Sequence, residues 1–380
     1  MSLIKFNEPF IAGSELEYIK DVFTQGHFSG NGKYTRLCQD FIASRLNTAV
    51  LLTDSCTSAL EMSALLLKEK RYQEVILPSY TFSSTAAAFA RAGFELIFAE
   101  IDPANMMLDI HDVEAKITPD TCAIIAVHYG GYSASILELK ALCDARQLYL
   151  IEDAAQAFDC FLTGKALGTF GSLGCVSFHE TKNIHAGMAG ALLVNDDNFY
   201  NRAAHIWERG TNRQEVLKGL VDKYSWVEVG GSFYPSELQA AFLYAQLEAL
   251  DRNNRERKVI YDSYRENLLG LRIKGLLAFP DFLAQYKPNY HAFFVIFNSE
   301  RECDNVREYL KEFQVMAYIG YVPLHSSAVG RRMGYAAEDL PVTEEYARRI
   351  LRLPFHNALT VQDVCRVSSL IGECLGETGL

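Results

Sequence analysis

The sequence lacks the features that mark membrane, disulfide-rich and repeat proteins. No apolar run approaches the length of a membrane span, and the N-terminus has neither the charged nor the apolar region of a signal peptide. The nine cysteines form no C-x-x-C pair, so neither a zinc site nor a disulfide framework is indicated. Internal repeats and low-complexity tracts are also absent from the sequence. We therefore expect a protein of the reducing cytoplasm that does not associate with a membrane.

The charge balance disfavours nucleic acid as a default ligand. The formal net charge is −11, although a local basic pocket could still bind a phosphate. With 380 residues, of which 49% are hydrophobic, the chain is long enough for one large α/β domain and a second, smaller domain.

Short apolar runs alternate with helical patterns through the first half of the chain. Because the runs are apolar on both faces, they predict a mostly parallel sheet covered by helices on both sides. The predicted strands are residues 49–52, 74–77, 95–100, 122–128, 148–151, 175–178 and 191–196.

The second half predicts a smaller α+β domain. A long helix with its N-cap at about Ser236 is expected to reach the 260s, and we place the domain boundary inside it, giving domains 1–250 and 251–380. Beyond it, strands at 291–297 and 315–318 are expected to alternate with helices at 304–313, 343–352 and 361–371.

Lys182 is the residue around which a site is expected. It follows the buried strand 175–178 in a turn that leaves through Gly187 and Gly190. Most lysines are solvated, and a loop lysine is the simple interpretation. The functional interpretation is a lysine that forms a Schiff base with pyridoxal phosphate (PLP), with Ser177 five residues earlier.

Three other turns fall at the carboxyl ends of predicted strands, where ligands of such sheets collect. Ser55, Cys56 and Thr57 lie between a strand and a helix, an arrangement that directs backbone N–H groups at an anion, although Ser55 could be an ordinary N-cap. Phe82 and Asp153 follow the other two strands.

These turns together supply what PLP requires of a protein. Asp153 could keep the pyridine nitrogen protonated, although it could instead be a helix N-cap. Gln156 could reach the 3-oxygen of the ring, and Phe82 could stack on the ring or simply lie in the core. Phosphate donors are expected from Ser55, Cys56, Thr57 and Ser177.

Seven ordered motifs across essentially the whole chain resemble the DegT/DnrJ/EryC1/StrS group of fold type I sugar aminotransferases. They begin with Ser55–Leu60, Pro78–Phe82, Val127–Gly130 and Glu152–Gln156, and they continue with Ser177–Asn183, Leu238–Ala241 and Pro323–His325. The resemblance implies the PLP-dependent transferase fold of type I, the PLP roles given above for the matching residues, and catalysis by Lys182 and Asp153. It also implies a homodimer with shared active sites, in which Ser232 of one subunit would reach the cofactor phosphate bound to the other.

Within the group, His179–Asn183, Gly210–Arg213 and Asp222–Trp226 resemble most the members that aminate C4 of dTDP-4-dehydro-6-deoxy-D-glucose. These members make dTDP-4-amino-4,6-dideoxy-D-galactose for enterobacterial common antigen, a surface polysaccharide. The resemblance implies L-glutamate as amino donor. Lys182 would move a proton from the glutamate Cα to the cofactor C4′, and 2-oxoglutarate would leave. The keto sugar would then take the amine by the reverse path.

Three departures from the group pattern leave the sugar open. Met188 stands in place of a carboxylate that often lines the sugar pocket, Ser232 replaces an asparagine, and Gly320 replaces a histidine. Amination of another 3- or 4-keto dTDP-, UDP- or GDP-sugar is therefore an alternative. A sugar 3-dehydratase is disfavoured because those relatives have histidine in place of the lysine. A non-catalytic regulator and an α/β protein that binds no PLP also stay open on the sequence.

Overall fold

A seven-stranded sheet is the centre of the larger part of the molecule. The computed structural model describes residues 2–68, 74–133 and 135–377. The strand order is β1-β9-β8-β5-β4-β2-β3, and β9 alone runs antiparallel to its neighbours. The strands are β1 (Ala49–Thr53), β2 (Glu74–Pro78), β3 (Glu95–Ala99), β4 (Thr121–Val127), β5 (Tyr149–Asp153), β8 (Leu173–Ser177) and β9 (Gly190–Val194). The predicted mostly parallel sheet is confirmed.

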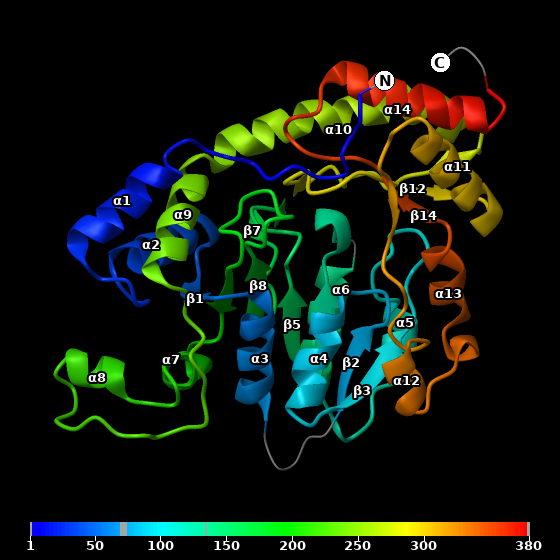
Figure 1. Ribbon diagram of the computed structural model, residues 1–380. Helices are drawn as coiled ribbons and strands as arrows, with labels where there is room; N and C mark the ends of the chain where they lie inside the picture. Colours follow the sequence, from blue (N-terminus) through cyan, green and yellow to red (C-terminus); the bar gives the residue numbers. More distant parts are fainter. Residues whose placement is uncertain (1, 69–73, 134, 378–380) are drawn as a thin grey trace.

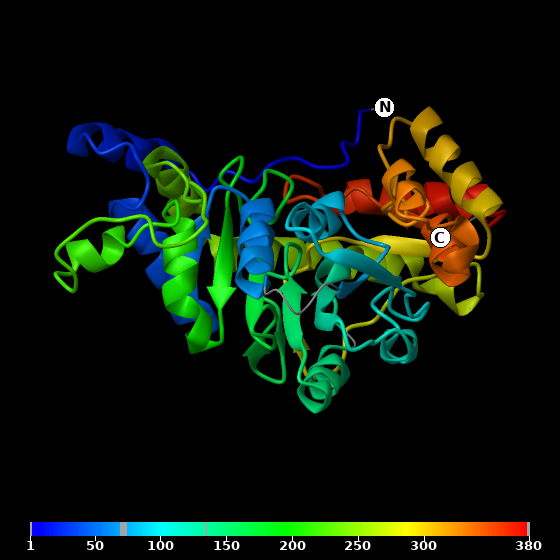
Figure 2. The ribbon, with the colours of Figure 1, turned by 90° about the horizontal axis from the view of Figure 1, so that it is seen from below.

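Helices cover both faces of this sheet, as the apolar strands require (Figures 1 and 2). Within β1, Leu51 belongs to the core under one helical layer and Leu52 to the core under the other. One layer contains α3 (Cys56–Leu67), α4 (Ser83–Arg91) and α7 (Tyr200–Trp207). The other contains α2 (Lys33–Leu46), α5 (Ile110–Ala115), α6 (Ile136–Arg146) and α9 (Glu237–Glu248), with α1 (Glu15–Gln25) packed on α9.

A second, antiparallel sheet lies in the C-terminal part, in the order β10-β12-β14-β13. Its strands are β10 (Leu277–Ala278), β12 (Phe294–Phe297), β13 (Tyr318–Ile319) and β14 (Ile350–Arg352). The helices of this part are α10 (Leu250–Ile273), α11 (Glu300–Glu312), α12 (Ala328–Arg332), α13 (Pro341–Ala347) and α14 (Val361–Cys374). Figure 2 shows α11 to α14 at the end of the molecule opposite α1 and α8 (Arg213–Leu217), and Figure 1 shows α10 running from α9 towards them. A small sheet of β6 (Phe161–Leu162), β7 (Lys165–Ala166) and β11 (Tyr286–Lys287) joins the two parts of the chain.

The predicted long helix begins where expected but is interrupted. Ser236 caps α9 in a capping box with Gln239, and the chain then breaks at Ala249 before α10 continues to Ile273. The core of the C-terminal part also takes in Ile4 from the N-terminus. The division into domains 1–250 and 251–380 stays a prediction. No helix in the described part of the chain is both long and apolar enough to cross a membrane.

The predicted helix 343–352 is wrong in its second half. Helix α13 ends at Ala347, and residues 350–352 form the strand β14. Sheet pairing on both edges overrides the local helical pattern, because Arg352 pairs with Phe294 on one side and with Tyr318 on the other. This error matters for function, because it concealed where the Arg352 side chain lies.

Candidate active site

The carboxyl ends of five strands of the large sheet, β1, β2, β4, β5 and β8, open into one cavity of about 440 Å³. Eight of the nine predicted site residues line it: Ser55, Cys56, Thr57, Phe82, Asp153, Gln156, Ser177 and Lys182. Ser232 is exposed and does not line this cavity in its own chain. The cavity wall also contains residues from the N-terminus and the C-terminal part, among them Phe6, Asn7, His291, Tyr321 and Arg352.

Lys182 is held in a tight turn directly after β8. Its N–H donates to the carbonyl of His179 at 2.8 Å, and the Glu180 N–H donates to the Gly187 carbonyl at 2.9 Å. Burial lowers the pKa of the Lys182 ε-amine to about 8, an effect that Asp153 opposes and the Arg352 charge reinforces. About half of the amine is therefore unprotonated near pH 8, where an ordinary lysine would be almost wholly charged. Lys182 lines the cavity and is half-buried, which distinguishes it from a fully solvated loop lysine.

Asp153 is a buried carboxylate without a cationic partner. Its two oxygens accept hydrogen bonds from the Thr85 hydroxyl at 2.7 Å and from the Ala155 N–H at 3.1 Å, and no ion pair reaches it within the described residues. No helix begins after it, so the N-cap interpretation of Asp153 is wrong. A buried carboxylate normally has a positive partner, and a protonated ring nitrogen in the cavity would be one.

The α3 N-terminus provides an anion site beside Lys182. Ser55 is the N-cap of α3, since its Oγ accepts from the Ser58 N–H at 3.1 Å, and the adjacent Cys56 and Thr57 begin the helix. A Cβ at Gly190 would lie 2.4 Å from the Cys56 nitrogen, so glycine lets β9 approach this turn. Burial raises the pKa of the Cys56 thiol well above its usual range, so the sulfur stays neutral. The donor set fits a phosphate.

Gln156 and Phe82 both line the cavity and both contact Tyr321. The Gln156 Oε1 accepts from the Gly130 N–H and its Nε2 donates to the Tyr321 hydroxyl, both at 2.7 Å, so the amide has a fixed orientation. Phe82 is 58% exposed at the cavity wall, with its ring centroid 6.2 Å from that of Tyr321. The core interpretation of Phe82 is therefore wrong, and its ring face is available to a planar ligand.

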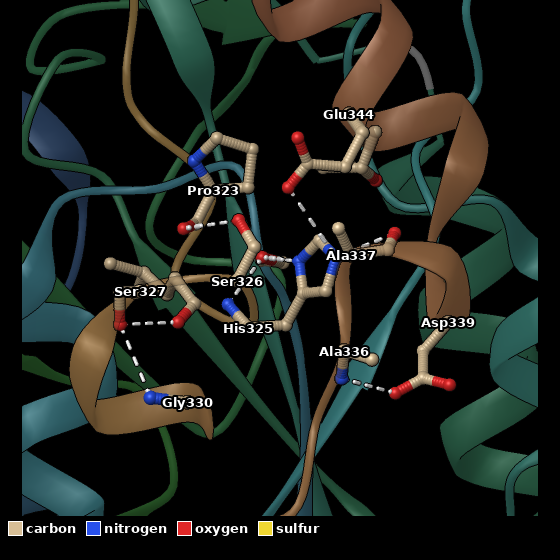
Figure 3. Close-up of polar contacts among 12 residues, drawn as sticks. Pro323, His325, Ser326, Ser327, Gly330, Ala336, Ala337, Asp339 and Glu344 are labelled. Carbon is tan, nitrogen blue, oxygen red and sulfur yellow. Dashed lines mark hydrogen bonds and ion pairs between the residues drawn. The ribbon is translucent and has the colours of Figure 1, made fainter. Parts of the chain in front are cut away.

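A buried histidine anchors the segment that carries Tyr321 (Figure 3). The Nε2 of His325 faces two acceptors, the Ala337 carbonyl at 3.4 Å and a Glu344 carboxylate oxygen at 3.7 Å, so this nitrogen holds the proton. Its Nδ1 then accepts from the Ser79 hydroxyl at 2.7 Å, while the His325 N–H donates to the same Ser79 oxygen at 3.0 Å. His325 and Ser79 are both fully buried, so their contacts are structural and fix the segment that carries Tyr321 to the end of β2.

The departure at Gly320 has a packing explanation. A Cβ at position 320 would lie 1.7 Å from the Tyr80 hydroxyl oxygen, which accepts from the Tyr321 N–H and donates to the Tyr129 hydroxyl, both at 3.2 Å. No histidine fits there in this packing. The tyrosines occupy the space instead.

The comparisons with known proteins agree with this geometry. The DegT/DnrJ/EryC1/StrS aminotransferase family matches residues 9–371. The chain belongs to this family. The sugar aminotransferase uses pyridoxal phosphate, and the cavity residues fit that cofactor.

Two relatives and one solved structure place the enzyme within the family. GDP-perosamine synthase of Vibrio cholerae is 27% identical and covers 98% of this chain and 100% of its own. The dTDP-4-dehydro-2,3,6-trideoxy-D-glucose 4-aminotransferase of Saccharopolyspora spinosa is 28% identical over 96% of this chain and 95% of its own. The structure of the aminotransferase TlmJ from Streptoalloteichus hindustanus superposes with a TM-score of 0.90, at 27% identity and 99% coverage of both chains. The predicted transferase fold of type I is confirmed.

Proposed function

We propose that the enzyme transfers the amino group of L-glutamate to C4 of dTDP-4-dehydro-6-deoxy-D-glucose, giving dTDP-4-amino-4,6-dideoxy-D-galactose for a surface polysaccharide such as enterobacterial common antigen. The observation that carries an aminotransferase is the meeting of Lys182, with its lowered pKa, and the unpaired carboxylate of Asp153 in one cavity. C4 and the dTDP group are supported by the relative that acts at C4 of a dTDP-keto sugar and by the motif resemblance.

The site residues take the roles that their positions allow. We propose that Lys182 binds PLP covalently, Asp153 faces the ring nitrogen, Gln156 lies near the 3-oxygen and Phe82 stacks on the ring. Ser55, Cys56, Thr57 and Ser177 would hold the phosphate. Bound PLP withdraws electrons from the substrate Cα and so acidifies its proton. The Lys182 Nζ takes that proton in the first half-reaction and delivers one to the sugar carbon in the second.

The test is transfer of labelled nitrogen from L-glutamate. The PLP-loaded protein is mixed with nitrogen-labelled L-glutamate and dTDP-, UDP- or GDP-linked 3- and 4-keto sugars, and mass spectrometry follows the label. Incorporation at C4 of the dTDP sugar supports the proposal. A preference for another nucleotide or for C3 replaces it with the different amination that Met188, Ser232 and Gly320 leave open. Failure to take up PLP would support a non-catalytic regulator.

We also propose a homodimer with shared active sites, formed through an apolar arm of residues 213–229. The arm comprises α8 and the loop after it, and Figure 1 shows it standing away from the body of the molecule. It exposes Leu217, Leu220, Val221, Tyr224, Trp226, Val227 and Val229. Such an exposed apolar segment marks a protein interface, and Ser232 follows at its base, where it could reach the partner's cofactor.

Replacing Trp226 by glutamate should dissociate this dimer. Trp226 is 76% exposed, and a central aromatic residue of an interface contributes enough that its loss raises the dissociation constant at least about 30-fold. Light scattering across a dilution series measures this constant. The matched control is V361E, an exposed apolar residue at the start of α14, at the far end of the molecule from the arm. If W226E and V361E leave the same oligomer, the arm is not the interface.

A further inference from the structure

Met188 is an exposed apolar side chain in the wall of the active-site cavity. It lines the cavity and is 55% exposed. Of the large apolar side chains that line the cavity in the described part of the chain, Met188 and Phe82 are the two that are more than half exposed. In the proposed function the Phe82 ring covers the cofactor. Met188 is therefore the exposed apolar surface that is left for a substrate.

The backbone around Met188 is held in a fixed position. Met188 belongs to the loop 178–189, which connects β8 to β9 and also contains Lys182. Three consecutive carbonyls of this loop accept hydrogen bonds: Gly187 from the Glu180 N–H at 2.9 Å, Met188 from the Gln239 side-chain amide at 2.9 Å, and Ala189 from the Phe178 N–H at 2.8 Å. Gln239 is itself oriented by the capping box of α9, because its Oε1 accepts from the Ser236 N–H. The loop therefore fixes the start of the Met188 side chain relative to the turn that carries Lys182.

The chemistry of methionine decides what can lie against this side chain. A thioether has no hydrogen-bond donor and is a weak acceptor. A substrate hydroxyl packed against it loses a hydrogen bond to water and gains none from the protein, whereas a methyl group gains from being buried there. Met188 therefore favours a substrate that is apolar at the position beside it.

The proposed sugar has one apolar position next to the carbon that reacts. C4 lies between C3, which carries a hydroxyl, and C5, which carries the C6 methyl group. A 6-hydroxy sugar has a hydroxymethyl group at that place, and a sugar that reacts at C3 has hydroxyl-bearing carbons on both sides. The reacting carbon must lie at the Lys182 amine, so a side chain held in the same loop lies near the neighbours of that carbon. An apolar side chain there suits the C6 methyl group.

We propose that Met188 contacts the C6 methyl group of the keto sugar and thereby selects a 6-deoxy sugar that reacts at C4. This inference rests on the proposed function and deepens it, because it names the residue that recognises the missing 6-hydroxyl. Met188 is also one of the three departures from the group pattern, so the contact is not one that the pattern supplies.

The experiment compares the binding of dTDP-6-deoxyglucose and dTDP-glucose, which differ by one hydroxyl at C6. Neither has a keto group, so calorimetry gives both dissociation constants on enzyme loaded with pyridoxamine phosphate, without reaction. Wild type should bind the 6-deoxy sugar about 10- to 100-fold more tightly, the range for a hydroxyl placed against an apolar wall. M188Q keeps the length of the side chain and can hydrogen-bond the hydroxyl, so the ratio should fall to within about threefold. M188L stays apolar and should keep the wild-type ratio.

Three controls separate recognition of the sugar from other effects. M333Q changes a methionine that is 45% exposed after α12 and does not line the cavity, and it should keep the wild-type ratio. Thymidine diphosphate should bind wild type and M188Q within about twofold of each other, which shows that the nucleotide site is intact. Light scattering should give the same oligomer for wild type and M188Q.

Several outcomes overturn the inference. The same ratio in M188Q and wild type removes Met188 from sugar recognition, and equal binding of both sugars by wild type removes the preference itself. Loss of the oligomer in M188Q explains the exposure of Met188 by contact with a second copy. If M188Q does not fold, an unchanged ratio in M188A counts against the contact. Preferred labelling of a 3-keto sugar by wild type also contradicts the selection of C4.

Failure of the proposed function gives a different result. In that case no labelled nitrogen reaches the dTDP-4-keto-6-deoxy sugar, whatever the ratio of the two dissociation constants. Transfer to this sugar together with an unchanged ratio in M188Q refutes the role of Met188 alone.

Discussion

Replacing Lys182 by alanine should reduce transamination by about 10,000-fold, the upper range for loss of a positioned general base. The turn after β8 places the ε-amine in the cavity, and burial lowers its pKa to about 8, so an unprotonated nucleophile and base is available near neutral pH. K182A would remove the attachment point that we propose for the cofactor and the group that we propose to carry the proton. Rates of both half-reactions, measured by rapid-mixing absorbance, test this expectation.

The location of the attachment is tested separately by borohydride reduction and peptide mapping. Wild type should yield one pyridoxylated peptide that contains Lys182, and K182A should yield none. The matched control is K165A, a lysine that is exposed at β7 and should keep wild-type rates within about twofold. A pyridoxyl group on another lysine, or a K182A rate close to that of wild type, would contradict the role of Lys182.

The lysine could be found in the sequence because parallel strands gather their carboxyl ends at one edge. Each of Ser55, Phe82, Asp153 and Lys182 follows an apolar run, and the alternation of such runs with helices already implies a parallel sheet. The structure brings all four to the same cavity. This inference needed only the direction of the strands and did not need the exact packing of the helices.

The other wall of the cavity could not be predicted in the same way. Arg352 was expected in a helix, and its position depends on pairing with Phe294 and Tyr318, which come from distant parts of the chain. His291 was expected at the start of a strand, but burial and the charge of Lys182, from a distant part of the chain, hold the pKa of its imidazole well below the usual range. Tertiary contacts of this kind leave no periodic signal in the sequence.

The tyrosine cluster illustrates the same limit at a position that the sequence did single out. Gly320 was recognised as a departure from the family pattern, but a sequence cannot show that the Tyr80 hydroxyl fills the space where a side chain would begin. Tyr80 is itself held by its contacts with Tyr129 and Tyr321. The departure is thus a packing adjustment across three elements. It affects the cavity wall, because Tyr321 lines the cavity.

Replacing Asp153 by asparagine should reduce the rate of both half-reactions by about 100- to 1,000-fold, the range for loss of a preorganised electrostatic group in an active site. Within the described residues the carboxylate is buried, accepts from the Thr85 hydroxyl and the Ala155 N–H, and forms no ion pair. An amide of the same shape keeps the space filled but cannot stabilise a protonated ring nitrogen. PLP should still attach to Lys182, so the protein stays coloured while donor Cα deprotonation slows. Cofactor absorbance and single-turnover rates measure these two quantities.

D144N, on the exposed surface of α6, is the matched control and should behave as wild type. A D153N variant with wild-type rates would leave Asp153 as a purely structural partner of Thr85.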